Sequence, residues 1–273
     1  DQSLKLDAVW LLFAAVYSVS LVFQAPIWIL SGLLAFMVYK IILAVGFAWQ
    51  RRRANASQTP LKLLLLRVFA LGKRSEQFFD ALGLHWRYRG SIQMIAGPDL
   101  ATTNIEPHEF MDFIGGKLAR RFIADAETFN LRLREADFAR DHDLRYRVNE
   151  FFCFNNAWKM ALTRLVQENH VVLMDLRGFS PRRAGCIFEI NELINAVPLA
   201  RVLFIIDQTT DEAFLRQTAQ EAWQRMRASS PNRSATRAAF RLFRLKDLDP
   251  RALTQLLAAV CASAATRVES VRI

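Results

Sequence analysis

The residues whose types and spacing could most readily do chemistry follow one apolar run in the second half of the chain. The run HVVLMDL places Asp175 at its end and Arg177 just beyond it, and the next segment, GCIFEINELINAV, carries Cys186 and Glu189. Glu189 could be a carboxylate aimed into a ligand cleft. The alternative is that Glu189 is a solvated residue of a first helical turn, where the helix dipole favours acidic side chains.

A second candidate is the short basic loop Gly72-Lys73-Arg74-Ser75, which leads into a segment with helical spacing. Free backbone N–H groups and the dipole at a helix N-terminus favour an anion, and Lys73 and Arg74 add positive charge. The loop lacks the glycine spacing of a phosphate-binding P-loop. Phosphate contact is therefore one interpretation, and a solvated turn capped by Ser75 is the other.

Two further aspartates follow strand-like runs. Gly97 and Asp99 come after SIQMIAG, and Asp207 ends RVLFIID. Aspartate is common at such positions because it forms local turns and caps helices. We include Gly97 and Asp99 among the candidate binding residues and interpret Asp207 as structural.

The pattern from residue 61 onward supplies the scaffold for these candidates. Apolar strand-like runs alternate with helical ones, which predicts a mostly parallel five-stranded sheet with helices on both faces. In such sheets ligands bind outside the carboxyl ends of the strands, where the strand order reverses. The predicted strands are 61–70, 91–97, 170–176, 201–207 and 238–245, and the predicted helices are 75–86, 106–122, 155–169, 185–197, 211–228 and 249–265.

The section at about 124–152 departs from this alternation. TFNLRLRE (128–135) and LRYRVNEFF (144–152) both alternate apolar and polar residues. Strict period two favours strands with one buried face, so we predict an inserted β-hairpin. Its other face carries arginines that could be solvated or could contact a phosphate or a lipid headgroup: Arg132, Arg134, Arg145 and Arg147. An amphipathic helix over 124–140 is the competing interpretation of the first half.

The N-terminus is strongly apolar. Residues 8–25 carry no charge and residues 27–49 carry only Lys40, and a spanning helix needs about 20 apolar residues. With a turn at Pro26, this predicts a transmembrane helical hairpin over 1–49, although a signal-peptide segment is the alternative for the first run. Lys40 either snorkels to the membrane surface or pairs with another subunit.

The boundary after the hairpin gives the orientation. Arg51, Arg52 and Arg53 follow the second apolar segment, and the positive-inside rule puts that side in the cytoplasm. We therefore predict a polar linker over 50–60 and a cytoplasmic α/β domain over 61–273, at the inner or plasma membrane.

The net charge of +10 belongs to the part of the chain after the hairpin. An anionic inner leaflet is the partner that it favours, and we rank nucleic acid below lipid because no nucleic-acid motif is present. The three cysteines and four histidines match no metal-ligand spacing, so we predict no metal site.

One stretch is similar to known families. VVLMDLRGFSPRRAGCIFEINELI followed by RVLFIID resembles the strand, loop, helix and strand around the catalytic glutamate of Toll/interleukin-1 receptor (TIR) domains. The resemblance runs over Gly185, Cys186, Ile187, Phe188 and Glu189. The stretch is also similar to nucleoside 2-deoxyribosyltransferases, with IAGPDL resembling their Ala-Gly-Pro turn. Both families have flavodoxin-like sheets and act on N-glycosidic bonds.

The resemblance implies a function and its site residues. A TIR-like domain would be an NAD glycohydrolase (an NAD⁺ nucleosidase) in which Glu189 stabilises the ribosyl cation. Asp175, Arg177 and Cys186 would line the pocket, and self-association at the membrane would switch the enzyme on. NAD is then the substrate, and no cofactor is expected.

The serine and tryptophan usual before the TIR cysteine are absent, which favours a non-catalytic nucleotide-sensing or signalling module. A deoxyribosyltransferase-like enzyme is a third hypothesis for the function.

Overall fold

The computed structural model describes residues 2–23, 25–26, 30–55, 60–67, 73–96, 122–141, 143–154, 156–236 and 239–269. The chain forms two compact units, Asp1–Thr59 and Pro60–Ile273. Both apolar cores described below consist of residues from the second unit alone. Because a domain with its own core can fold independently, we expect residues 60–273 to fold without the N-terminal unit.

The N-terminal unit is a pair of helices, α1 (Gln2–Val22) and α2 (Ser31–Asn55). Gly32 brings the two backbones together, since an added Cβ would lie 2.2 Å from the carbonyl oxygen of Ala14. The Gly32 N–H donates to the hydroxyl of Ser18 at 2.9 Å. Lys40 forms an ion pair with Asp7 at 2.8 Å, so it has a partner within the chain.

Among the described helices, one is long and apolar enough to cross a membrane, over residues 31–49. The apolar part of α1, over residues 6–21, is shorter. The expected helical hairpin is therefore present, with Pro26 between its helices, and its second helix alone meets the length of a membrane span.

The second unit is an α/β fold around a six-stranded sheet in which every neighbouring pair is parallel. The strand order is β3-β2-β1-β4-β5-β6. This is the order of dinucleotide-binding doubly wound folds, and removing β3 leaves the flavodoxin order. The strands are β1 (Leu61–Arg67), β2 (Gly90–Ala96), β3 (Val148–Phe152), β4 (Val171–Asp175), β5 (Val202–Ile206) and β6 (Arg241–Arg244).

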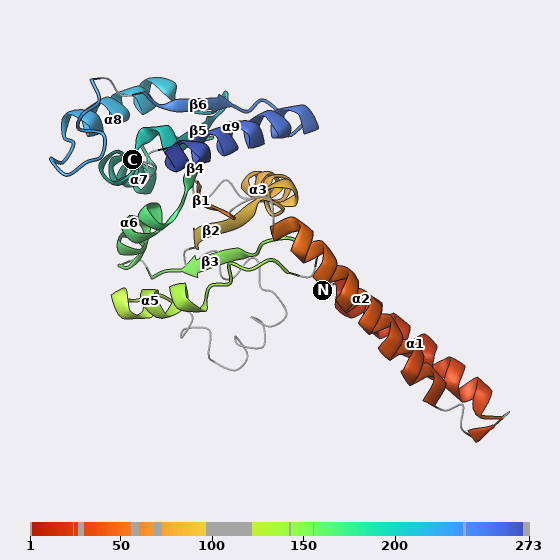
Figure 1. The fold of residues 1–273 in the computed structure, drawn as a ribbon. Helices are drawn as coiled ribbons and strands as arrows, with labels where there is room; N and C mark the ends of the chain where they lie inside the picture. Colours follow the sequence, from red (N-terminus) through yellow and green to blue (C-terminus); the bar gives the residue numbers. More distant parts are fainter. Residues whose placement is uncertain are drawn as a thin grey trace. The chain divides into compact units, whose positions relative to one another are not determined.

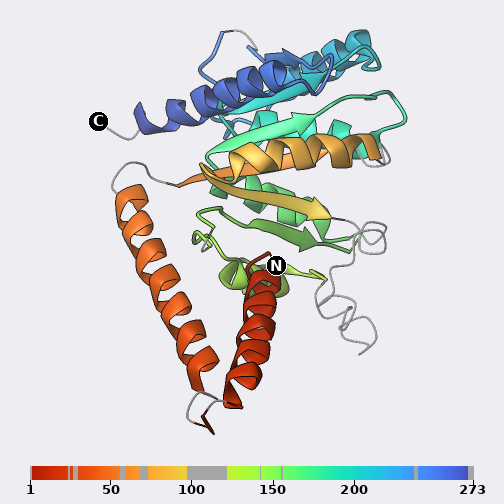
Figure 2. The ribbon, with the colours of Figure 1, turned by 90° about the vertical axis from the view of Figure 1, so that its right-hand side faces the viewer.

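Helices cover both faces of this sheet, as Figure 1 shows. One face packs against α6 (Trp158–Glu168), α7 (Ala184–Ala196) and α8 (Glu212–Gln224). The other face packs against α3 (Lys73–Trp86) and α9 (Pro250–Glu269), which lie across the sheet in Figure 2. Successive residues of a strand point to opposite faces, and β1 accordingly sends Leu63 and Leu65 to one core and Leu64 and Leu66 to the other.

The five predicted strands all form, so the expected scaffold is confirmed apart from its strand number. Asp249 caps α9, with its carboxylate accepting from the N–H of Ala252 at 2.5 Å. The helix expected over 106–122 lies almost entirely outside the described residues, which resume at residue 122.

The prediction of an inserted β-hairpin over about 124–152 is wrong. Its first half is the helix α5 (Ala126–Glu135), which begins with a capping box between Asp125 and Thr128. Its second half provides β3, which pairs parallel to β2 and adds a sixth strand to the sheet. The period-two pattern gave the wrong prediction for the first half because both structures fit it. Phe129 is buried in the core and Leu133, one helical turn later, packs against that core, while Leu131 between them is 52% exposed.

Candidate functional site

The strand order reverses between β1 and β4, which are neighbours in the sheet. The chain leaves β1 for α3 on one face and leaves β4 for α7 on the other. Arg67 at the end of β1 is in register with Asp175 at the end of β4. Ligands of doubly wound folds bind at such a reversal, outside the carboxyl ends of the strands.

Asp175 and Arg177 form a closed ion pair at this point. The two oxygens of Asp175 accept from Nε and Nη2 of Arg177 at 2.8 and 2.7 Å, and the side chains are only 1% and 3% exposed. The guanidinium lies 4.7 Å from the ring centroid of Phe78 on α3. Gly178, with φ of 70°, supplies the left-handed turn after the pair.

A second buried carboxylate lies at the end of β5. Asp207 accepts from the N–H of Thr209 at 2.9 Å and from its hydroxyl at 2.6 Å, and it is paired with Arg74 of α3. Burial opposes ionisation of Asp207, but the bonds from Thr209 and Arg74 outweigh it and lower its pKa. Arg74 therefore links the helix after β1 to the loop after β5.

Ser75 is buried, at 6% exposure, in the first turn of α3. The helix begins at Lys73, so Ser75 is inside it, and the expected role as its cap is wrong. The Ser75 hydroxyl has no hydrogen-bond partner among the described residues. A buried polar atom without a partner costs stability unless another group satisfies it, so this hydroxyl is available to a bound ligand.

Glu189 is buried rather than solvated. It lies in the second turn of α7, on the face that also buries Cys186, Ile190 and Leu193, and its side chain is only slightly exposed, at 4%. One carboxyl oxygen, Oε2, has no partner among the described residues. The alternative of a solvated first-turn residue is therefore wrong.

The electrostatics of α7 follow from this burial. Desolvation raises the pKa of Glu189 to about 8, although a hydrogen bond with the Cys186 side chain works in the other direction. Desolvation also raises the pKa of the Cys186 thiol to about 12, with further contributions from Glu189 and Asp175. Near neutral pH, Glu189 is thus mostly protonated and Cys186 is an unreactive thiol.

The predicted site residues fall into two groups. Asp175, Arg177, Arg74 and Ser75 lie at the carboxyl ends of the strands or in the first turn of α3, and Cys186 and Glu189 lie together on α7. Lys73 begins α3. Three candidates lie outside the described residues: Gly72, Gly97 and Asp99.

The sequence analysis missed the contribution of Asp207. Its partners Thr209 and Thr210 follow at once in the sequence, and this short polar run was the one available signal. The Thr210 hydroxyl accepts from the Asp207 N–H at 3.1 Å and donates to the Leu176 carbonyl at 3.0 Å, which ties the loops after β4 and β5 together. No cluster of metal-ligand side chains occurs among the described residues.

Comparison of the chain with protein-family models, curated proteins and solved structures finds no match. The fold and the side chains at the strand ends are therefore the basis for assigning a function.

Proposed function

We propose that the chain is a membrane-anchored nucleotide-binding module whose ligand occupies the carboxyl edge of the sheet at β1 and β4. The observation that carries this proposal is the buried Ser75 hydroxyl without a partner in the first turn of α3, beside Arg74. A helix N-terminus attracts phosphate through its free N–H groups and dipole, and both side chains would add to that attraction.

The strand order supports a nucleotide as the ligand by fold analogy, since it is the order of dinucleotide-binding folds. Asp175 and Arg177 would form a rigid, pre-organised wall of the site, because their ion pair is closed and buried. The hairpin would anchor the module, and the arginines at 51–53 favour a cytoplasmic domain facing an anionic leaflet. In this role the module would sense or signal, with self-association at the membrane.

A second candidate function is hydrolysis of the nicotinamide–ribose bond of NAD, and the Glu189 carboxyl favours it. Its Oε2 atom is buried without a partner among the described residues, as a group reserved for a reacting atom would be. Stabilising a ribosyl cation needs the ionised form. With a pKa of about 8, the rate in this case should rise with pH through about 8 and level off above it, unless assembly or ligand binding ionises Glu189 first.

Binding and turnover separate the two functions. The full chain in nanodiscs would be titrated with NAD and ADP-ribose by calorimetry, and the same chain clustered on anionic liposomes would be assayed for free nicotinamide. Saturable binding without nicotinamide release supports the sensor. Release that disappears in Glu189→Gln supports the glycosidase.

The site is tested with matched variants. Loss of the Ser75 hydroxyl (Ser75→Ala) and of the Arg74 charge (Arg74→Gln) should each weaken binding about tenfold. Arg251→Gln, an exposed arginine at the start of α9, is the control and should bind normally. Absence of binding by NAD, ADP-ribose and ATP to the folded chain would reject the proposal.

A further inference from the structure

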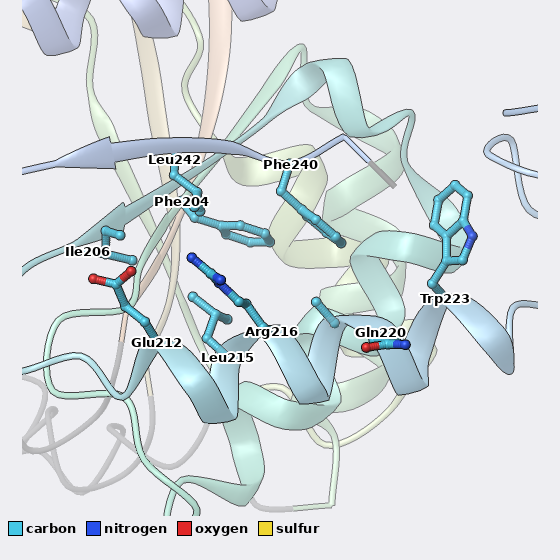
Figure 3. Close-up of a pocket in the computed structure, with 10 residues that line it drawn as sticks. Phe204, Ile206, Glu212, Leu215, Arg216, Gln220, Trp223, Phe240 and Leu242 are labelled. Atoms are coloured by element: carbon cyan, nitrogen blue, oxygen red, sulfur yellow. The ribbon is translucent and has the colours of Figure 1, made fainter. Parts of the chain in front are cut away.

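An apolar groove runs between α8 and the edge strand β6 (Figure 3). Phe204 and Ile206 of β5, Leu215 and Ala219 of α8, and Phe240 and Leu242 beside or within β6 contribute its apolar surface. It encloses about 220 Å³. None of the residues assigned above to nucleotide binding lines it.

The groove exists because β6 is the last strand of the sheet. Phe243 and Leu245 belong to the core under α9, whereas Phe240 and Leu242 face the side of α8. Phe240 stacks on Phe204 of β5 with 5.4 Å between ring centroids, but Leu242 stays 52% exposed. Contiguous apolar surface that a fold leaves open is typical of a binding site.

The rim of the groove is basic. Arg244 donates to Glu212 at 2.9 Å and so occupies its carboxylate. Arg216 is exposed and lines the groove, and among the described residues it has neither a hydrogen bond nor an ion pair. Its contact with Glu212 is electrostatic only. Two arginines therefore face one glutamate, and the surplus positive charge is complementary to an anion.

A second copy of the chain fits this surface poorly. Ten residues line the groove, whereas a stable protein interface uses about 20–30 on each side. The groove matches a small ligand better than a protein surface.

We propose that this groove binds an amphipathic anion of the fatty-acid type, with its acyl chain along Phe204, Phe240 and Leu242 and its head group at Arg216. The groove has a volume of about 220 Å³ and an apolar lining, which suits a short acyl chain. The ligand is either a free carboxylate or one chain and the head group of an anionic lipid.

The test uses residues 60–273, which contain both cores, so that no detergent competes for the groove. Decanoate should bind saturably with a Kd on the order of 100 µM. Decyltrimethylammonium, with the same chain and a cationic head, should bind at least tenfold more weakly. If a short-chain phosphatidic acid binds more tightly than decanoate, the ligand is an anionic lipid. If decanoate binds more tightly, the ligand is a free carboxylic acid.

Two variants separate the head from the chain. Arg216→Gln should weaken decanoate binding about tenfold. It should strengthen binding of the cationic amphiphile, because it removes the like charge that repels the cationic head. Ala219→Leu should weaken both, because it fills the groove. Arg251→Gln on the opposite face is the matched control and should change neither, and circular dichroism would establish that each variant is folded.

Several results would overturn the proposal. The first is the absence of saturable decanoate binding. The second is equal binding of decanoate by the wild type and both groove variants. A third is a dimer of the fragment that Leu242→Asp dissociates, since the groove would then be a self-association surface. Because the nucleotide residues do not line the groove, failure here leaves the nucleotide proposal standing, and the converse also holds.

Discussion

At the scale of single residues, Glu189 couples the stability of the fold to pH. Its pKa is raised to about 8 by burial, from an ordinary value of 4.5. Between these two values the native state keeps a proton that the unfolded chain has released. The stabilisation is therefore complete below about pH 4.5 and is lost as the pH rises through about 8.

Replacing Glu189 by glutamine should remove this dependence. The free energy of unfolding of the wild type should fall, relative to Glu189→Gln, by up to about 1.4 kcal/mol per pH unit within that window. Urea denaturation of residues 60–273 at pH 5.5, 6.5 and 7.5 measures this free energy of unfolding for both proteins. Glu168→Gln, at an exposed glutamate of α6, is the control. Parallel pH curves for wild type and Glu189→Gln would show that Glu189 is ionised in the fold.

The Asp175–Arg177 pair makes a second prediction at this scale. Arg177→Met leaves a carboxylate that is 1% exposed without its partner, which should cost about 3–5 kcal/mol. The double variant Asp175→Leu with Arg177→Met removes both charges and should recover most of that loss. Denaturant titration of the fragment tests both. A single variant as stable as the wild type would mean that the pair contributes orientation but no stability.

At the scale of elements, one asparagine fixes the connection between α7 and β5. The Asn232 amide donates to the carbonyls of Ile194 and Val197 at 2.7 and 2.8 Å, and its oxygen accepts from Leu199 N–H at 3.0 Å. The Asn232 side chain, in a loop that follows α8, thus provides hydrogen-bond partners for the backbone groups at and after the end of α7.

Asn232→Ala should therefore destabilise the fold by about 2–4 kcal/mol, since it leaves buried backbone groups unsatisfied. The control is Asn191→Ala, because Asn191 donates only to the carbonyl of Ile187 one turn earlier in α7. Hydrogen exchange of the Leu199 amide offers a local measurement, and its protection should fall in Asn232→Ala alone. Equal losses in both variants would contradict this assignment.

The sequence pattern predicted the elements where local signals agreed, as at the five apolar strands. It failed over residues 128–135, where Phe129, Leu131 and Leu133 fit a strand and Phe129 and Leu133 equally fit a helix. The Asp125–Thr128 capping box was the deciding signal, and it is local. Pairing of β3 with β2 depends on tertiary structure and has no local signal.

Parts of the candidate site were predictable for the same reason. Asp175 and Arg177 follow a strand directly, so their place at the sheet edge could be inferred. The pairing of Arg74 with Asp207 could not be, because 133 residues separate the two in sequence. The burial of Glu189 could not be predicted either. Its neighbours Phe188 and Ile190 are both apolar, so the sequence does not tell which face of the helix points into the core.

At the scale of the whole molecule, the chain separates into a helical hairpin and an α/β domain that differ in the apolar surface they expose. The hairpin exposes many large apolar side chains along α1 and α2, among them Phe13, Leu34 and Ile42. Such surface is stable in lipid but not in water. The domain buries its apolar residues in two cores that use no residue of the hairpin.

If the hairpin is the membrane anchor proposed above, removing residues 1–59 should release the domain from the membrane at no cost to its fold. Its free energy of unfolding should stay within about 0.5 kcal/mol of the value for the domain in the full chain, as for changes that touch no core contact. The full chain should remain in the membrane pellet after an alkaline carbonate wash, and the fragment should remain in the supernatant. If the fragment instead lost more than about 1 kcal/mol, contacts with the hairpin would have to be part of the fold of the domain.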